Sequence, residues 1–177
     1  MTPDLLRDDC TRCAALCCVA LAFDRSAAFA CDKPSGMPCA HIGPNATCSI
    51  HAQRQAKGFS GCIGFSCNGA GQRVVQECFA GRDWRDDPRL ITRMTKAFLV
   101  ALKVHDLLML LAEVEKLPLS PQEREKAREF AHALSSDTAL TESWLSDLDV
   151  SKHQASVHAF LRGLAPRWAS MQYSVSR

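Results

Sequence analysis

The chain has 177 residues, 47% of them hydrophobic and 23% charged, as in an ordinary soluble globular protein. Its formal net charge is +2, and residues 1–90 carry ten Lys and Arg against nine Asp and Glu. No basic half exists, so nucleic acid is not an expected partner. The N-terminus has no apolar secretion signal. The longest strongly apolar run, 107–112, is far shorter than the ~20 residues that span a bilayer. We therefore expect a cytoplasmic protein with no membrane association.

The N-terminal region, residues 1–90, is rich in cysteine and glycine. All ten cysteines lie between Cys10 and Cys78. Residues 10–88 contain short apolar runs without a sustained helical period, which predicts only short helices and turns. Such a segment has too little apolar surface to build a core unaided, so bound metal would be part of its fold.

Eight of the cysteines form a spaced pattern that indicates metal ligation. They are Cys10, Cys13, Cys17, Cys18, Cys39, Cys48, Cys62 and Cys67. In a reducing cytosol, clustered thiols are more often metal ligands or catalytic groups than disulfides. Eight thiolates satisfy two tetrahedral zinc sites or two four-cysteine iron–sulfur clusters, and the count does not separate these alternatives. One polynuclear cluster with spare thiols is a third arrangement.

The C-terminal region, residues 91–177, predicts a small helical bundle. Residues on one face of an amphipathic helix recur at three- and four-residue steps through 91–116. This stripe consists of Ile91, Met94, Phe98, Ala101, Leu102, His105, Leu108, Met109 and Ala112. His105 is expected to be a satisfied core histidine. Ser120-Pro121-Gln122-Glu123 is a capping box that starts a second helix. A shorter segment is expected around 138–145. Ser151-Lys152-His153-Gln154 predicts another capping box, with Gly163 and Pro166 closing the last helix. The expected fold is thus mainly α, with an irregular metal-bound N-terminal half and a helical bundle packed on it.

The cysteine pattern also resembles a known family. The run Cys10-x2-Cys13-x3-Cys17-Cys18, with Pro38-Cys39, Cys48-Ser49-Ile50-His51, Arg54 and the pair Cys62 and Cys67, is similar to the zinc- or iron-chelating cysteine-rich family of bacterial proteins. The resemblance covers roughly residues 8–70. Residues 10–88 also resemble the N-terminal module of some bacterial pentapeptide-repeat proteins, although no pentapeptide repeats follow in this chain. The stretches that carry this wider resemblance include Asp32-Lys33-Pro34, Gly69-Ala70-Gly71-Gln72 and Asp83-Trp84-Arg85.

This resemblance implies that the eight patterned cysteines bind metal or an iron–sulfur cluster. Flagellin lysine methylases look related through the same motif and carry an iron–sulfur cluster, which favours 4Fe–4S over zinc here. The chain departs from the family pattern at two positions, where His51 replaces the usual Tyr and Gln55 the usual Pro.

Five further residues lie near the pattern without being expected as ligands. Cys31 and Cys78 are expected to be small buried hydrophobes. His41 and His51 are expected to hydrogen-bond near the site or face solvent rather than ligate. For Arg54 two roles stay open: a donor toward an anionic thiolate site, or a solvated side chain.

These observations predict a cytoplasmic metal-binding protein with a redox, sensing or partner-binding role and a protein partner. Two alternatives remain: a cluster-dependent enzyme that modifies a protein or peptide, and a zinc-stabilised structural adaptor. No catalytic motif stands out in the sequence, so no catalytic residue is assigned.

Overall fold

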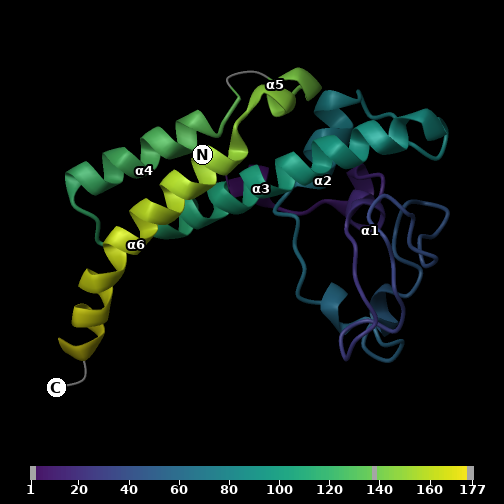
Figure 1. Cartoon of the computed structure of the whole chain (residues 1–177), viewed down its shortest axis with the longest axis horizontal. Coiled ribbons are helices and arrows are strands. Elements are labelled where there is room, and N and C mark those ends of the chain that lie inside the picture. The colour runs from purple at the N-terminus through teal and green to yellow at the C-terminus, as the bar shows by residue number, and fades with distance from the viewer. Residues whose placement is uncertain (1–2, 137–138, 175–177) are drawn as a thin grey trace.

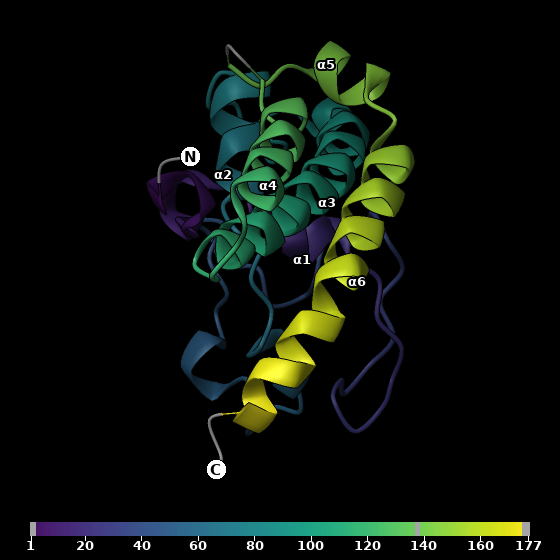
Figure 2. The ribbon, with the colours of Figure 1, turned by 90° about the vertical axis from the view of Figure 1, so that its left-hand side faces the viewer.

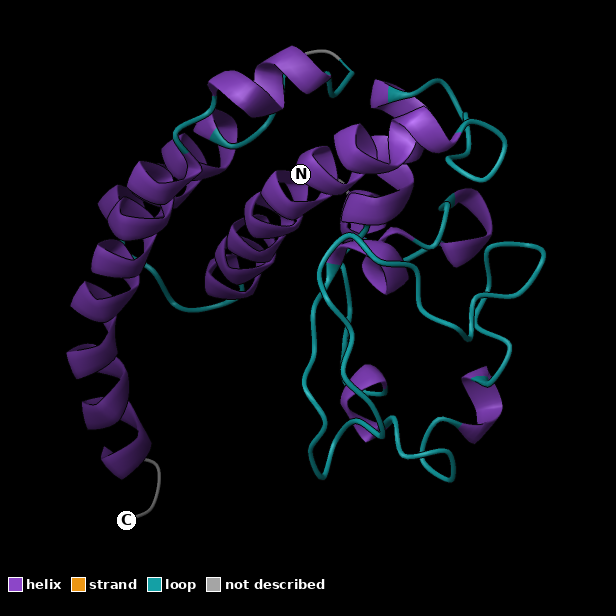
Figure 3. Cartoon of the chain, turned by 45° about the vertical axis from the view of Figure 1, so that its right-hand side comes forward, coloured by secondary structure: helices purple, strands orange, loops and turns teal. Residues whose placement is uncertain are grey.

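The computed structural model describes residues 3–136 and 139–174, and it is mainly helical, as the sequence predicts. Helices gather on one side of the molecule and irregular loops on the other (Figure 3). Extended pairing in the described residues is limited to isolated antiparallel bridges, Phe23 with Lys33, Ser26 with Phe29 and Ile42 with Cys48. The described residues therefore contain no sheet, and the loops depend on turns and side-chain contacts.

The N-terminal half consists of short helices and turns, in agreement with its lack of helical periodicity. Its elements are the 3-10 helices Pro3–Leu6, Cys10–Arg12, His51–Gln53, Ser60–Cys62 and Pro88–Leu90, the α-helices α1 (Leu16–Ala20) and α2 (Ala70–Arg73), and the π-helical turn Val74–Cys78 that continues α2. Gly69 is the N-cap of α2 and adopts the left-handed conformation with φ 83°.

Helix α3 (Ile91–Glu115) is the central element of the fold. Its bounds match the predicted helix over 91–116 within a residue, and Met94, Phe98 and Leu108 are fully buried as expected. Leu107 and Leu111, outside the predicted stripe, are buried too. These two residues are buried because other helices cover α3 on several sides. Helices α1 and α2 pack against one end of α3, and α4 and α6 lie beside the other end (Figures 1 and 2).

Helices α4 and α5 begin at side-chain caps. In α4 (Pro121–Ala133) the predicted capping box is present, with Ser120 accepting from the Glu123 amide and Glu123 from the Ser120 amide. Helix α5 (Glu142–Asp147) is capped by the Thr141 hydroxyl. The helix expected around 138–145 is thus present but starts and ends later in the chain than predicted. Position 138 lies outside the described residues.

Helix α6 (Val150–Ser174) differs from the prediction at both ends. The Asp149 carboxylate accepts from the Lys152 amide at 3.1 Å, so the predicted cap at Ser151 is wrong. Asp is as good a capping residue as Ser and lies two positions earlier. The predicted end at Gly163 and Pro166 is also wrong, because the helix continues to Ser174. One glycine costs a helix only about 1 kcal/mol, and a proline inside a helix removes one internal hydrogen bond and can kink the helix without ending it.

The core consists of two apolar clusters that share α3. One joins Leu16, Val74 and Phe79 of the cysteine-rich half to Met94 and Phe98. The other lies among α3, α4 and α6. Neither cluster contains a residue from the loops between 23 and 65. No helix in the described ranges is both long and apolar enough to span a membrane.

Candidate metal centre

Helix α1 carries the two adjacent cysteines at the middle of the pattern. The sulfurs of Cys17 and Cys18 are 3.9 Å apart, within hydrogen-bonding distance for thiols. Successive residues on a helix point about 100° apart, so the two side chains can serve different neighbours. Ala15, in the left-handed conformation with φ 53°, turns the chain into α1 and sets this direction.

Cys17 faces a group that we call the first thiol set, made of Cys10, Cys13, Cys17 and Cys67. Thiolate charge on Cys67 and Cys10 acts on Cys13, and charge on Cys13 and Cys67 acts on Cys17, so Cys13, Cys17 and Cys67 lie near one another and Cys10 lies near Cys13. The charge of Cys18 also acts on Cys10, so Cys10 borders both sets. The set is assembled from the Cys10–Arg12 turn, α1 and the residue just before α2.

Side-chain amides connect the two segments that carry this set. The Asp9 amide donates to Gln72 Oε1 at 3.1 Å, and Gln76 Nε2 donates to the Arg12 carbonyl at 3.0 Å. Asp8 Oδ1 accepts from the Cys67 thiol at 3.2 Å and from the Gly69 amide at 2.9 Å. Residues about 60 positions apart are therefore held side by side before any metal binds.

Two glycines at the start of α2 leave room for this approach. At Gly69, with φ +83°, a Cβ would be 2.3 Å from the Leu5 carbonyl oxygen. At Gly71 a Cβ would be 2.7 Å from the Cys13 sulfur and 3.7 Å from the Cys67 sulfur. Only glycine at position 71 therefore lets the Cys13 and Cys67 sulfurs approach the start of α2 this closely.

The remaining four patterned cysteines form the second thiol set: Cys18, Cys39, Cys48 and Cys62. The charges of the other three thiols act on Cys62, and those of Cys18 and Cys48 act on Cys39. The Cys39 amide donates to the Cys18 carbonyl at 3.0 Å. The bridge between Ile42 and Cys48 brings the next loop back beside Cys39.

Two cations accompany the second thiol set. Lys33 is only 7% exposed, and its ammonium donates to the Val19, Pro34 and Met37 carbonyls at 3.0, 3.1 and 2.8 Å. Arg54 donates from Nη1 to the Cys62 carbonyl at 2.7 Å. Both cations act on the Cys18 thiolate, and Arg54 also acts on Cys10 and Cys62. Of the two roles left open for Arg54, the structure favours the one near the thiols.

The thiols differ in how readily they ionise. Burial raises the pKa of Cys13 to about 12 and that of Cys67 to about 11. The hydrogen bond with Cys17 lowers the pKa of Cys18 to about 7; burial opposes this shift, and the Lys33 and Arg54 charges reinforce it. The same hydrogen bond, followed by burial, raises the pKa of Cys17. A metal that bound here would displace protons from buried thiols, and Cys18 is the thiol that ionises most readily among those with a lowered or raised pKa.

All ten cysteines are free thiols, so the chain contains no disulfide framework among its described residues. The thiols of each set are neighbours but do not yet converge. Over 3–136 and 139–174, no three Cys, His, Asp or Glu side chains lie close enough to hold one ion. A metal held by the four thiols of either set would therefore need these sulfurs to move closer together. The donor set itself, four thiols at each place, fits zinc or an iron–sulfur cluster.

The residues outside the pattern have mixed outcomes. Cys78 is half-buried against the core and donates to the Leu140 carbonyl at 3.4 Å, in line with a packing role. Cys31 is exposed, so its predicted burial is wrong; it lies in the loop between Phe23 and Lys33, which contributes nothing to the core. The His41 ring packs edge-on against Phe59, with ring centres 5.0 Å apart.

The long helix supports the first thiol set through His105. This side chain is 1% exposed, and its Nδ1 lies 2.5 Å from the Asn68 carbonyl oxygen, next to Cys67 in the chain. Its Nε2 lies 3.5 Å from Arg73 Nη1, and Arg73 pairs with Glu77 at 2.8 Å. His105 is thus the satisfied core histidine that its helical position predicts, and it ties α3 to the segment after Cys67.

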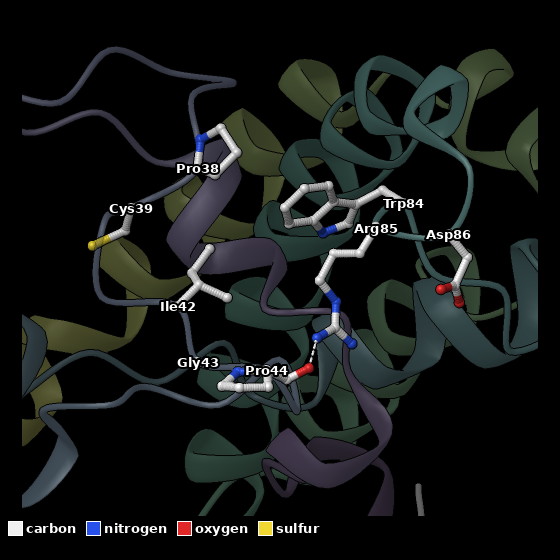
Figure 4. Close-up of a pocket in the computed structure, with 8 residues that line it drawn as sticks. All are labelled: Pro38, Cys39, Ile42, Gly43, Pro44, Trp84, Arg85 and Asp86. Carbon is white, nitrogen blue, oxygen red and sulfur yellow. Dashed lines mark hydrogen bonds between the residues drawn. The ribbon is translucent and has the colours of Figure 1, made fainter.

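An open cavity of about 550 Å³ borders the second thiol set (Figure 4). The Trp84 ring and the Arg85 side chain form one wall, and Arg85 donates to the Pro44 carbonyl on the other. The remaining lining residues are Pro38, Cys39, Ile42, Gly43 and Asp86. In Figure 4 the Cys39 sulfur is directed away from Trp84 and Arg85. The cavity therefore borders the backbone that carries this thiol.

Comparison with known proteins identifies a relative without assigning an activity. No family model matches the chain, and no solved structure matches it. The uncharacterized protein YybG of Bacillus subtilis (strain 168) is 36% identical over 156 residues, which cover 88% of this chain and 56% of YybG. The chain therefore spans about half the length of this relative.

Proposed function

We propose that this chain is a cytoplasmic metal-binding protein that holds iron–sulfur clusters or zinc through its eight patterned cysteines. Cys10, Cys13, Cys17 and Cys67 would hold one group, and Cys18, Cys39, Cys48 and Cys62 the other. The observation that carries the proposal is the gathering of free sulfurs from distant segments into two neighbouring sets, each with the four thiols that such a group requires.

The weakness of the loops without a ligand also supports the proposal. Between residues 23 and 65 the buried apolar side chains are Ala46 and Phe59. A segment of this length orders only if something offsets its conformational entropy, and a few apolar contacts are too little. Metal–sulfur bonds supply that stabilisation in small irregular domains.

The chain's own residues prepare the two sets in different ways. Asp8 positions the Cys67 thiol and the start of α2. Arg54 and Lys33 place positive charge beside the second set. An iron–sulfur cluster supplies one-electron chemistry when bound, whereas zinc held by four thiolates has no redox chemistry and supplies stability. The resemblance to the cysteine-rich family favours 4Fe–4S, and with it a redox or sensing role and a protein partner.

Metal analysis of protein purified without oxygen tests the proposal. We expect at least one metal group per chain, and acid-labile sulfide with visible sulfide-to-iron absorption if the metal is iron. Cys17→Ser should lower the metal content. Cys31→Ser is the matched control, because this exposed thiol lies outside the pattern and its loss should leave metal content unchanged. Protein with freely titratable thiols and less than one metal atom per chain would refute the proposal.

A second candidate function, a cluster-dependent enzyme acting on a protein or peptide, is favoured by the cavity beside Cys39. A catalytic metal keeps one position open to an outside ligand. Addition of small anions to cobalt-loaded protein should then change the visible cobalt spectrum. An unchanged spectrum would leave a fully sulfur-ligated site and exclude this candidate.

A further inference from the structure

A buried ammonium group lies beside the second thiol set without an acidic partner. Three backbone carbonyls accept from Lys33, and in the described part of the chain no carboxylate lies within ion-pair distance of it. Carbonyl groups satisfy its hydrogen bonds but do not neutralise its charge. Since a buried charge is costly unless it is paired, this position calls for an anion nearby.

The nearest groups that can become anions are thiols. Among the described residues, the charges that act on Lys33 belong to Cys39, Cys18 and Cys17, in that order. The carbonyls that hold the ammonium belong to Val19, next to Cys18, and to Met37, two residues before Cys39. Lys33 thus connects the two backbone segments that present these thiols.

The backbone fixes Lys33 in this place. Its amide and carbonyl both pair with Phe23, at 2.8 and 3.0 Å, and its ammonium lies 5.6 Å from the centre of the Phe23 ring. The Gly36 amide donates to the Val19 carbonyl at 3.0 Å, which closes the loop over α1. The cation is therefore held in position before any metal arrives.

We propose that Lys33 is the built-in counter-cation of the second thiol set, and that it makes this set the tighter of the two metal sites. Four thiolates around a divalent ion carry a net charge of about −2, which a buried ammonium offsets at short range. The first set has the Asp8 carboxylate at Cys67 instead, which adds negative charge. This inference rests on the proposed function and adds an order to it: the second set fills first and releases its metal last.

Lys33→Gln separates charge from hydrogen bonding. The amide of glutamine still donates to a carbonyl, but the positive charge is lost. In full-length reduced protein titrated with cobalt against a chelator, Lys33→Gln should weaken binding at the second set by about 10- to 100-fold, as outer partners of metal ligands commonly do. Lys33→Arg should restore most of the affinity. Lys57→Gln, on an exposed lysine, is the control and should leave the titration unchanged.

Two cysteine backgrounds locate the effect. In Cys67→Ser, which damages the first set, the change Lys33→Gln should still weaken cobalt binding. In Cys48→Ser, which damages the second set, it should have no further effect. Equal affinities of wild type and Lys33→Gln, or an equal loss in both backgrounds, would overturn the role of Lys33 and leave the proposed function intact.

Two further outcomes separate this inference from its premise. Wild-type protein that binds no cobalt would overturn both the proposed function and the role of Lys33. If Lys33→Gln does not accumulate as folded protein, Lys33→Met provides a second neutral side chain of similar length. A far-ultraviolet circular dichroism spectrum that matches wild type, together with unchanged cobalt affinity in that variant, would equally overturn the role of the charge.

Discussion

Acidification should destabilise this protein through His105. The Asn68 carbonyl can only accept a hydrogen bond, so His105 Nδ1 carries the ring proton and Nε2 faces the Arg73 guanidinium. Burial, and after it the Arg73 charge, lowers the pKa of His105 from 6.5 to about 4. Protonation in the folded state would place a second positive charge in the core beside Arg73.

The size of the effect follows from the difference between the folded and unfolded states. Between about pH 6.5 and about pH 4 the unfolded chain binds a proton at His105 and the folded chain does not, so the free energy of unfolding falls as pH falls. At about 1.4 kcal/mol per pKa unit, the shift is worth about 3 kcal/mol. Urea denaturation followed by far-ultraviolet circular dichroism, at neutral pH and near pH 4 (about the folded pKa), measures it.

A variant comparison isolates His105 from the other groups that titrate in acid. His105→Gln removes this titrating group. Its free energy of unfolding should therefore fall by about 3 kcal/mol less than that of wild type over the same pH range. Leu108→Ala, one turn further along α3 and fully buried, lowers stability without removing a titratable group, and its loss on acidification should equal that of wild type. Equal losses in wild type and His105→Gln would refute the assignment of a neutral core histidine.

Three other predictions concern the metal centre and the helices. Gly71→Ala should lower the metal-to-protein ratio, because its Cβ would be 2.7 Å from the Cys13 sulfur; Gly163→Ala, with open space around it, should leave the ratio unchanged. Removal of metal by a chelator should increase amide hydrogen exchange in residues 23–65 far more than in α3, and equal increases would contradict the view that metal stabilises the loops. Ser120→Ala should lower the free energy of unfolding by about 1 kcal/mol in thermal denaturation, and no change would show that α4 does not need its cap.

The helical half could be predicted because its signals are local. Periodic apolar residues identify α3, and the capping box at Ser120 identifies the start of α4. The bounds of the last helix were less predictable, because several nearby residues can each cap or end a helix. Asp149 replaced Ser151 as the cap, and Pro166 did not stop the helix. The residue at which a helix begins or ends depends on its tertiary contacts, and a short stretch of sequence does not show these contacts.

The sequence predicts the composition of the proposed metal centre but not its arrangement. Spacing predicts the eight cysteines as ligands, whereas their division into two sets depends on how the loops return to α1. Asp32-Lys33-Pro34 belongs to the stretches that carry the wider resemblance, but nothing in the sequence assigned Lys33 a place beside the thiols. Its burial arises from the pairing with Phe23 and from three carbonyls brought together only by the fold. The need for glycine at position 71 likewise becomes visible only in the fold, where the Cys13 sulfur lies close to it.

The two halves of the chain are stabilised by different means that meet at the thiols. Leu16 and Val74 pack against α3, so α1 and α2, which flank the first thiol set, rest on a hydrophobic core that exists without metal. The second set lies on loops that bury few apolar side chains. In these loops the buried Lys33 and the thiols whose charges act on it are the main interior groups. A metal bound at Cys18 would therefore join a segment already ordered by packing to loops that packing cannot order. The adjacent pair Cys17 and Cys18 lies at this junction, one sulfur facing each set.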